Sequence, residues 1–191
     1  MLFIGDIHGC FDIYQDLIKN HDKSIQLGDF GVGFPDWVPF DIPLDHLFLR
    51  GNHDNPAVCR EHPNYLGDYG FNEDFFYISG AYSIDKDLRI IDVDWWAEEE
   101  LSYGDWKAVI DLYSKIRPKT VISHDCPKIV FQTLFNAPYY PNRTSQAMDQ
   151  LWEIHQPKTW IFAHYHVSAK RQVKDTLLVC LNINETFEFS A

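Results

Sequence analysis

Five short apolar runs, each followed at once by polar residues, constrain the fold more than any other feature of the sequence. The polar clusters that follow them are Gly5-Asp6-Ile7-His8-Gly9, Gly28-Asp29, Gly51-Asn52-His53-Asp54, His124-Asp125 and His164-Tyr165-His166. Brief apolar runs bounded by turn-forming residues are typical of buried strands. Because ligands bind beyond the carboxyl ends of strands in open α/β sheets, we expect these polar groups to converge on one edge.

The segments between these runs show both helical and alternating patterns. Apolar side chains at helical spacing predict helices over residues 11–18, 106–116 and 148–155, the second of them opened by Ser102 and Asp105. Apolar and polar residues alternate within residues 70–94, at Phe76-Ile78 and Tyr82-Ile84, which predicts antiparallel strands. Residues 167–189 show the same pattern with a turn at Lys174-Asp175, and the same prediction applies to them. No repeat or linker interrupts the pattern. We therefore predict a single α/β domain over residues 1–191.

Composition and charge restrict the kinds of molecule that the chain is expected to bind. Hydrophobic residues make up 46% of the chain and charged residues 23%, which is ordinary for a folded protein. A formal net charge of −12 disfavours binding to nucleic acid through a basic patch. The same charge is compatible with a phosphate substrate, because bound metal ions can invert the local potential.

The cysteines and the apolar runs indicate the compartment. Cys10, Cys59, Cys126 and Cys180 are scattered and form no C-x-x-C pair, as expected for reduced thiols. No apolar run reaches the roughly 18 residues of a membrane span. The first motif begins at Gly5 and leaves no room for a signal peptide. We expect a cytoplasmic protein with no membrane partner.

The side chains at the strand ends suit metal chemistry. They are Asp6, His8, Asp29, Asn52, His53, His124, His164 and His166. Carboxylates, imidazoles and an amide without thiolates favour divalent Mn, Fe, Co, Ni or Zn. The donors are too many for one tetrahedral ion and about enough for two. One carboxylate, for instance Asp29, can bridge ions about 3.5–4 Å apart, as in two-metal hydrolytic sites.

The order of these motifs resembles the calcineurin-like metallophosphoesterase superfamily. The resembling motifs are G-D-x-H-G, G-D, G-N-H-D, a lone histidine after a strand, and H-x-H, and they span Gly5 to His166. The resemblance implies a four-layer α/β/β/α sandwich of two mixed β-sheets flanked by helices. It also implies an enzyme that hydrolyses phosphate esters, a phosphatase or a phosphodiesterase.

Carried over residue by residue, the resemblance implies a dinuclear metal centre. One ion would be held by Asp6, His8 and His166, the other by Asn52, His124 and His164, with Asp29 bridging the two. Manganese is the expected metal. The implied reaction is in-line attack of a metal-bridging hydroxide on phosphorus, with His53 assisting the leaving group.

Two departures separate the chain from the protein-phosphatase branch of the superfamily. That branch carries G-D-x-x-D-R-G, where this chain has Val32 and Gly33 in place of the Asp-Arg pair. It also carries G-N-H-E, where this chain has Asp54. We therefore do not expect efficient phosphoprotein hydrolysis.

Four charged residues near the motifs are further candidates. Arg50 either contacts phosphate or forms a structural salt bridge, and Arg143 lies in a loop that could overhang the site, where it could supply the cation that Gly33 lacks. Asp54 and Asp125 are either acceptors for imidazole N–H groups or ordinary carboxylates. The acidic triplet at residues 98–100 is interpreted as a solvated approach to the helix that follows.

Three functions remain open on the sequence alone. The first is hydrolysis of a small or accessible phosphate monoester or diester. The second is a nuclease of the same superfamily, which the acidic balance and the lack of a basic groove disfavour. The third is a non-catalytic scaffold, which is disfavoured because every ligand position and His53 are filled. The sequence does not determine the oligomeric state.

Overall fold

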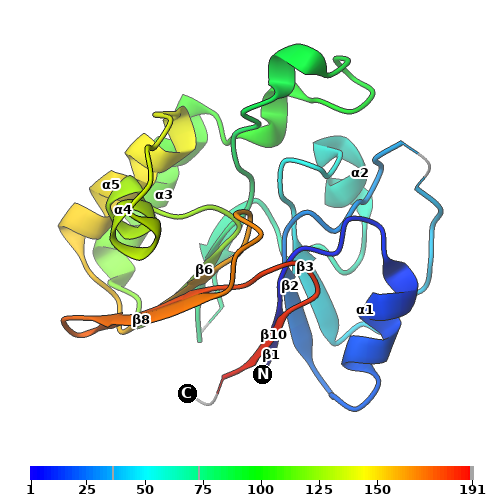
Figure 1. The fold of residues 1–191 in the computed structure, drawn as a ribbon, viewed down its shortest axis with the longest axis horizontal. Helices are drawn as coiled ribbons and strands as arrows, with labels where there is room; N and C mark the ends of the chain where they lie inside the picture. Colours follow the sequence, from blue (N-terminus) through cyan, green and yellow to red (C-terminus); the bar gives the residue numbers. More distant parts are fainter. Residues whose placement is uncertain (36, 73, 190–191) are drawn as a thin grey trace.

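Two β-sheets form the centre of the molecule in a computed structural model that describes residues 1–35, 37–72 and 74–189 (Figure 1). The first sheet has four strands in the order β10 (Thr186–Glu188), β1 (Leu2–Ile4), β2 (Ser24–Leu27) and β3 (His46–Leu49). β1, β2 and β3 are parallel, and β10 is antiparallel to β1. The carboxyl ends of the first three strands therefore point the same way.

The second sheet has six strands and is also mixed. Its order is β4 (Tyr69–Phe71), β5 (Phe76–Ile78), β6 (Thr120–Ser123), β7 (Thr159–Phe162), β9 (Thr176–Cys180) and β8 (Ala169–Val173). The four central strands are parallel, and antiparallel strands close both edges. The predicted turn at Lys174-Asp175 joins β8 to β9, which confirms the antiparallel prediction for that stretch.

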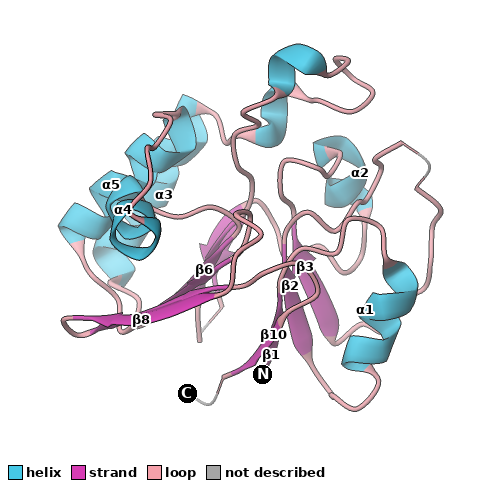
Figure 2. Cartoon of the chain, viewed as in Figure 1, coloured by secondary structure: helices cyan, strands magenta, loops and turns pink. Residues whose placement is uncertain are grey.

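Helices cover the outer face of each sheet (Figure 2). The first sheet is flanked by α1 (Phe11–Ile18) and α2 (Pro56–Glu61), and the second by α3 (Tyr103–Ile116), α4 (Lys128–Phe135) and α5 (Arg143–Ile154). Within the described ranges, no helix is both long enough and apolar enough to cross a membrane.

The alternation of side chains along each strand divides the core into three layers. Leu2 and Ile4 pack with α1, whereas Phe3 points the other way, toward the second sheet. Ile122 and Ile161 of the second sheet meet Phe3 in that central layer and are fully buried. Three apolar layers between two sheets and two sets of helices make the four-layer α/β/β/α sandwich, and the fold prediction is confirmed.

The helix predictions over 11–18, 106–116 and 148–155 correspond to α1, α3 and α5. α3 begins with the expected capping box, in which Ser102 and Asp105 satisfy each other's backbone N–H groups. The sequence did not reveal α2 or α4.

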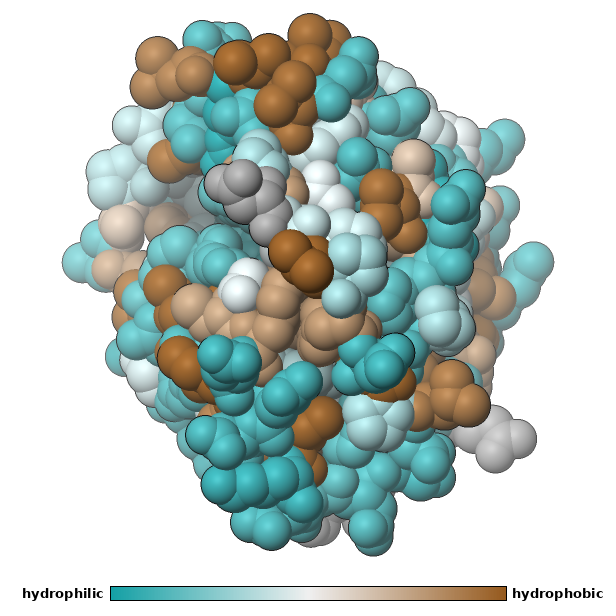
Figure 3. Space-filling view, turned by 90° about the vertical axis from the view of Figure 1, so that its right-hand side faces the viewer, coloured by the Kyte–Doolittle hydropathy of each residue, from teal (hydrophilic) through white to brown (hydrophobic). Residues whose placement is uncertain are grey.

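The prediction of a strand at Tyr82-Ile84 is wrong. That stretch belongs to the connection from β5 to α3, which contains two short 3₁₀ helices, η1 (Lys86–Leu88) and η2 (Ala97–Glu99). The side chain of Ile84 is 76% exposed, and Ser83 bonds to Glu99 instead of to a neighbouring strand. The connection projects from the molecule, and apolar side chains gather at its surface (Figure 3).

Candidate metal centre

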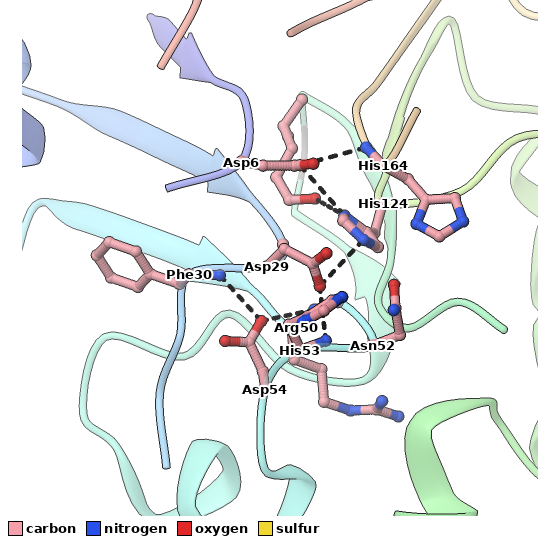
Figure 4. Close-up of polar contacts among 12 residues, drawn as sticks. Asp6, Asp29, Phe30, Arg50, Asn52, His53, Asp54, His124 and His164 are labelled. Carbon is pink, nitrogen blue, oxygen red and sulfur yellow. Dashed lines mark hydrogen bonds and ion pairs between the residues drawn. The ribbon is translucent and has the colours of Figure 1, made fainter. Parts of the chain in front are cut away.

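Strands β1, β2 and β3 of the first sheet and β6 and β7 of the second are parallel within their sheets, and each is followed by polar side chains. Side chains from both sheets point toward one another in Figure 4. Asp6 follows β1, Asp29 follows β2, Asn52 and His53 follow β3, His124 follows β6, and His164 and His166 follow β7. The structure thus brings together the residues that the sequence placed at strand ends.

Four of these residues form a first group of potential ligands. One ligand atom from each of Asp6, His8, Asp29 and His166 lies within 4.8 Å of the others. His166 Nε2 lies 3.0 Å from Asp6 Oδ2 and 3.0 Å from His8 Nε2. Imidazole nitrogens and carboxylate oxygens directed at a common point are a suitable set for a divalent cation.

A second group lies beside the first and shares one residue with it. Ligand atoms of Asp29, His124 and His164 lie within 4.8 Å of one another. His124 Nε2 is 3.3 Å from Asp29 Oδ1, and His8 Nε2 is 3.9 Å from Asp29 Oδ2. The two oxygens of Asp29 thus face the two groups.

Three buried atoms at this place lack a hydrogen bond within the described part of the chain. They are Asp6 Oδ2, Asn52 Oδ1 and His124 Nε2. Asp6 Oδ2 and His124 Nε2 lie 3.0 and 3.3 Å from His166 Nε2 and Asp29 Oδ1, but without the geometry of a hydrogen bond. Each side chain is fixed through its other end: His124 Nδ1 donates to the carbonyl of Leu27 at 2.8 Å, and Asn52 Nδ2 donates to Ser83 Oγ at 3.1 Å. A buried polar atom without a partner is costly, so these donors fit metal ions.

Ser83 and Glu99 orient the amide of Asn52 and were missed by the sequence reading. Glu99 is 2% exposed and accepts from both the hydroxyl and the backbone N–H of Ser83, at 2.6 and 2.9 Å. The interpretation of residues 98–100 as a solvated stretch is therefore wrong for Glu99. Burial raises the pKa of Glu99, against the hydrogen bonds from Ser83, which lower it.

The backbone at the centre requires glycine at two positions. A Cβ atom on Gly51 would lie 2.1 Å from Asp29 Oδ1 and 2.5 Å from His124 Nε2. Gly28 has φ of +102°, and a Cβ there would lie 2.4 Å from the His124 ring. Four of the potential ligands themselves adopt left-handed backbone conformations: His8, Asp29, His164 and His166. Such strain is typical of functional sites.

Asp54 ties two of the ligand-bearing loops together. Its carboxylate accepts backbone N–H groups from Phe30, Gly31 and Val32 at 3.1, 2.6 and 2.9 Å, and from Gly51 at 2.7 Å. The interpretation of Asp54 as an acceptor for an imidazole N–H is replaced by this backbone role. The residues after Asp29 and those before Asn52 are thereby held in one arrangement.

Asp125 also takes a role other than imidazole acceptor. It accepts from the Tyr165 hydroxyl and, at 2.7 Å, from the backbone N–H of Cys126. Burial raises the pKa of Asp125 to about 6, against these hydrogen bonds, which lower it. The carboxylate supports the wall of the cleft beside His164.

The two arginines singled out from the sequence do not reach the centre. Arg50 is 0% exposed, and its guanidinium donates to Asp68 at 2.8 Å and to the carbonyl of Glu99 at 2.7 Å. Arg50 therefore forms the structural salt bridge. Arg143 pairs with Glu100 at 3.4 Å and lines a separate depression between α3 and α5.

A cleft opens beside the ligands and contains an arginine that the sequence reading missed. Its volume is about 450 Å³, and Asp29, Asn52, His53 and His164 line it on the side of the ligands. The other lining residues are Tyr82, Ile84, Asp85, Arg89, Asp125, Phe131, Pro138, Tyr139, Tyr140, Asn142, Tyr165 and His166. Arg89 is the one arginine between residues 61 and 116, and its charged neighbours in the sequence are largely acidic. This isolation is the signal in the sequence by which Arg89 could have been found.

The charges at the centre depend on one another. Burial would raise the pKa of Asp29 and lower that of His124, but their mutual attraction reverses both shifts. The pKa of Asp29 falls, and that of His124 rises to about 9. Burial lowers the pKa of His164 to about 3, so its imidazole is neutral, as a metal ligand must be. In the absence of metal, a proton on His124 thus compensates the charge of Asp29.

The chain belongs to the calcineurin-like phosphoesterase family, which it matches over residues 1–168. Members of this family are hydrolases that act on phosphoesters and bind divalent metals, and the ligand groups described above agree with that class.

One solved structure similar to the chain in fold is a phosphopantetheinyl hydrolase from Mycobacterium tuberculosis. The TM-score is 0.50 at 11% sequence identity, and the alignment covers 96% of this chain and 89% of that chain. At this identity the similarity concerns the fold alone. No curated protein matches the sequence.

Replacing Asp54 by asparagine tests the link between the loops. Asp54→Asn places an NH₂ group against backbone N–H donors, so we expect the free energy of unfolding to fall by about 3 kcal/mol. Urea unfolding measures the change. Asp111→Asn, on the exposed face of α3, serves as control and should stay within about 0.5 kcal/mol of wild type. Equal stability of the two variants would contradict the role of Asp54.

The pH dependence of stability tests the proton on His124. Its pKa is about 9 in the folded chain and near 6.5 when unfolded, so the folded protein holds the extra proton between these values. The stabilisation is complete below about pH 6.5 and is lost as the pH rises toward 9. With a chelator present, the midpoint temperature of thermal unfolding should therefore decrease as the pH is raised from about 6.5 to about 8.5.

Two comparisons complete this measurement. With Mn²⁺ in excess, the decline should disappear, because metal binding displaces the proton and is favoured by rising pH. The chelated His124→Gln variant should lose most of the slope as well. A chelated wild-type protein whose midpoint is constant or rises over this range would exclude the assigned protonation.

Proposed function

We propose that the chain is a dinuclear-metal phosphoesterase that hydrolyses small phosphate monoesters or diesters. The observation that carries this proposal is the position of Asp29, whose two oxygens face two adjacent groups of ligands. Two cations that share one carboxylate lie close enough to act on one phosphoryl group.

The contacts among the potential ligands support their division between two cations. Asp6, His8 and His166 would hold one cation, and Asn52, His124 and His164 the other, with Asp29 between them. Manganese is the proposed metal, and iron, nickel, cobalt or zinc suit the same donors. Bound cations would supply Lewis acidity toward the phosphoryl oxygens and a water of lowered pKa.

The position of His53 beside the potential ligands supports a role in assisting the leaving group. It belongs to neither ligand group, but its ring centroid is 5.0 Å from that of His8, and its backbone N–H donates to Asp29 Oδ1 at 2.7 Å. Its ring lines the cleft. Burial lowers the pKa of His53, and the charge of Arg89 acts in the same direction against Asp29. We propose that its ring assists departure of the leaving oxygen.

The size and lining of the cleft favour a small organic ester. About 450 Å³ accommodates a phosphoryl group with one or two compact substituents. Beyond the ligands the wall is aromatic: His164 contacts Tyr165, which contacts Phe131, which contacts Tyr139, at centroid distances of 4.8–5.0 Å. The net charge of −12 argues against a long polyanionic substrate.

Asp29→Asn tests the shared carboxylate. Asparagine tolerates the left-handed backbone of this position, so the fold should survive while the ability to bridge two cations is lost. With Mn²⁺ present, we expect hydrolysis of p-nitrophenyl phosphate or bis-p-nitrophenyl phosphate to fall more than about 100-fold. Metal analysis should show fewer than two ions per chain. Asp111→Asn is the matched control. A fully active Asp29→Asn protein would exclude the proposal.

His53→Gln separates catalysis from metal binding. Because His53 is outside both ligand groups, the variant should retain two metals per chain. We expect kcat to fall by about 10²–10⁴-fold, the usual contribution of a group that assists proton transfer. Parallel metal analysis and steady-state kinetics provide the measurement. Loss of metal in proportion to activity would instead make His53 a ligand.

A further inference from the structure

Arg89 brings a permanent positive charge into the cleft. Among the described residues that line the cleft, it is the one lysine or arginine. Its side chain is 8% exposed, although it belongs to a connection whose neighbouring apolar side chains, Leu88 and Ile90, are 89% and 63% exposed. The segment projects outward while this one side chain turns inward.

The local backbone and one ion pair hold Arg89 in that position. Arg89 ends η1, and its backbone N–H donates to the carbonyl of Lys86 at 3.1 Å. Asp85, four residues earlier, pairs with Arg89 Nη2 through Oδ1 at 2.8 Å. The carbonyl of Asp94 accepts from Nη1 at 3.4 Å.

The inner contact of Arg89 is with the residue beside the metal ligands. Arg89 Nη2 lies 2.8 Å from His53 Nε2. A guanidinium can only donate, so Nε2 of His53 acts as acceptor and carries no proton in this arrangement. His53 thus links Arg89 to Asp29, because the Asp29 carboxylate accepts the backbone N–H of His53.

The contact with His53 is a weak interaction for the guanidinium of Arg89, which is a strong hydrogen-bond donor. A neutral ring nitrogen accepts one hydrogen bond, whereas a phosphoryl group offers several charged oxygens in a geometry that suits the planar guanidinium. An anion that entered the cleft would be the better partner. The exchange would also free Nε2 of His53.

We propose that Arg89 binds the phosphoryl oxygens of the substrate, and that its contact with His53 is the resting contact which the substrate displaces. The inference rests on the proposed function and names a binding residue for that same site. Arg89 replaces Arg50 and Arg143 in this role, since it lines the cleft, whereas Arg50 is fully buried against Asp68 and Arg143 lines a separate depression.

Direct binding of inorganic phosphate tests the proposal without turnover. Isothermal titration calorimetry of the Mn²⁺-loaded protein should show a Kd that rises about 10- to 100-fold in Arg89→Ala. Arg89→Lys should lie between, because lysine keeps the charge but lacks the planar fork. Guanidinium ion added to Arg89→Ala should restore part of the affinity, which a purely structural role would not allow.

Lys86→Ala is the matched control for charge. It removes one positive charge from the same segment, but the Lys86 ammonium lies over the rings of Tyr82 and Trp95, at 5.1 and 5.9 Å. Its phosphate Kd should stay within about 2-fold of wild type, because Lys86 does not line the cleft and solvent ions screen its more distant charge. Arg89→Gln, checked by circular dichroism and metal content, provides a second variant in case Arg89→Ala loosens the segment.

The outcomes separate this inference from the function on which it rests. Equal phosphate affinity in wild type and in folded Arg89→Ala and Arg89→Gln, or an equal loss of affinity in Lys86→Ala, overturns the role of Arg89. No phosphate binding by the metal-loaded wild type overturns it as well. If wild type binds phosphate through Arg89 but hydrolyses no ester, the proposed function fails and Arg89 remains an anion-binding residue.

Discussion

Two carboxylates held out of water at one edge of the sandwich, Asp6 and Asp29, impose the constraint on which the rest of the site depends. Both are almost fully buried, and removing a charge from water costs several kcal/mol unless it is compensated. The imidazoles around them compensate only in part: Asp6 Oδ2 lies 3.0 Å from His166 Nε2, but without the geometry of a hydrogen bond within the described residues. In the absence of metal, a proton on His124 compensates part of this charge, and divalent cations bound to the potential ligands would compensate it more completely.

Residues outside the two ligand groups fix the conformation of the potential ligands, despite the cost of burying the two carboxylates. Asp54 collects four backbone N–H groups from two loops, and Gln26 connects two strand ends, donating to the carbonyl of Gly5 and accepting from the N–H of Gly28, each at 3.0 Å. Ser83 fixes the amide of Asn52. Because these contacts satisfy backbone groups that the tight turns leave unpaired, the ligands keep strained conformations that a free loop would abandon.

Local sequence patterns predicted the elements whose stability is local. α1, α3 and α5 follow from their apolar stripes and, for α3, from its capping box. The same rules failed at Tyr82-Ile84, because alternation in so short a stretch requires a neighbouring strand that the fold does not provide. They also left Arg50, Arg143 and Glu99 open or misread, since a charge in sequence does not show whether it will be buried with a partner.

The sequence by itself determined which potential ligands follow which strands, because residues just beyond the parallel strands of one sheet meet at one edge of that sheet. Tertiary structure alone decided which charges enter the cleft. Arg89 and Ser83 come from the connection between β5 and α3, about 30 residues beyond the Asn52 motif, and their approach depends on long-range contacts with His53 and Asn52. No local pattern encodes such contacts, since they arise only when the two sheets pack.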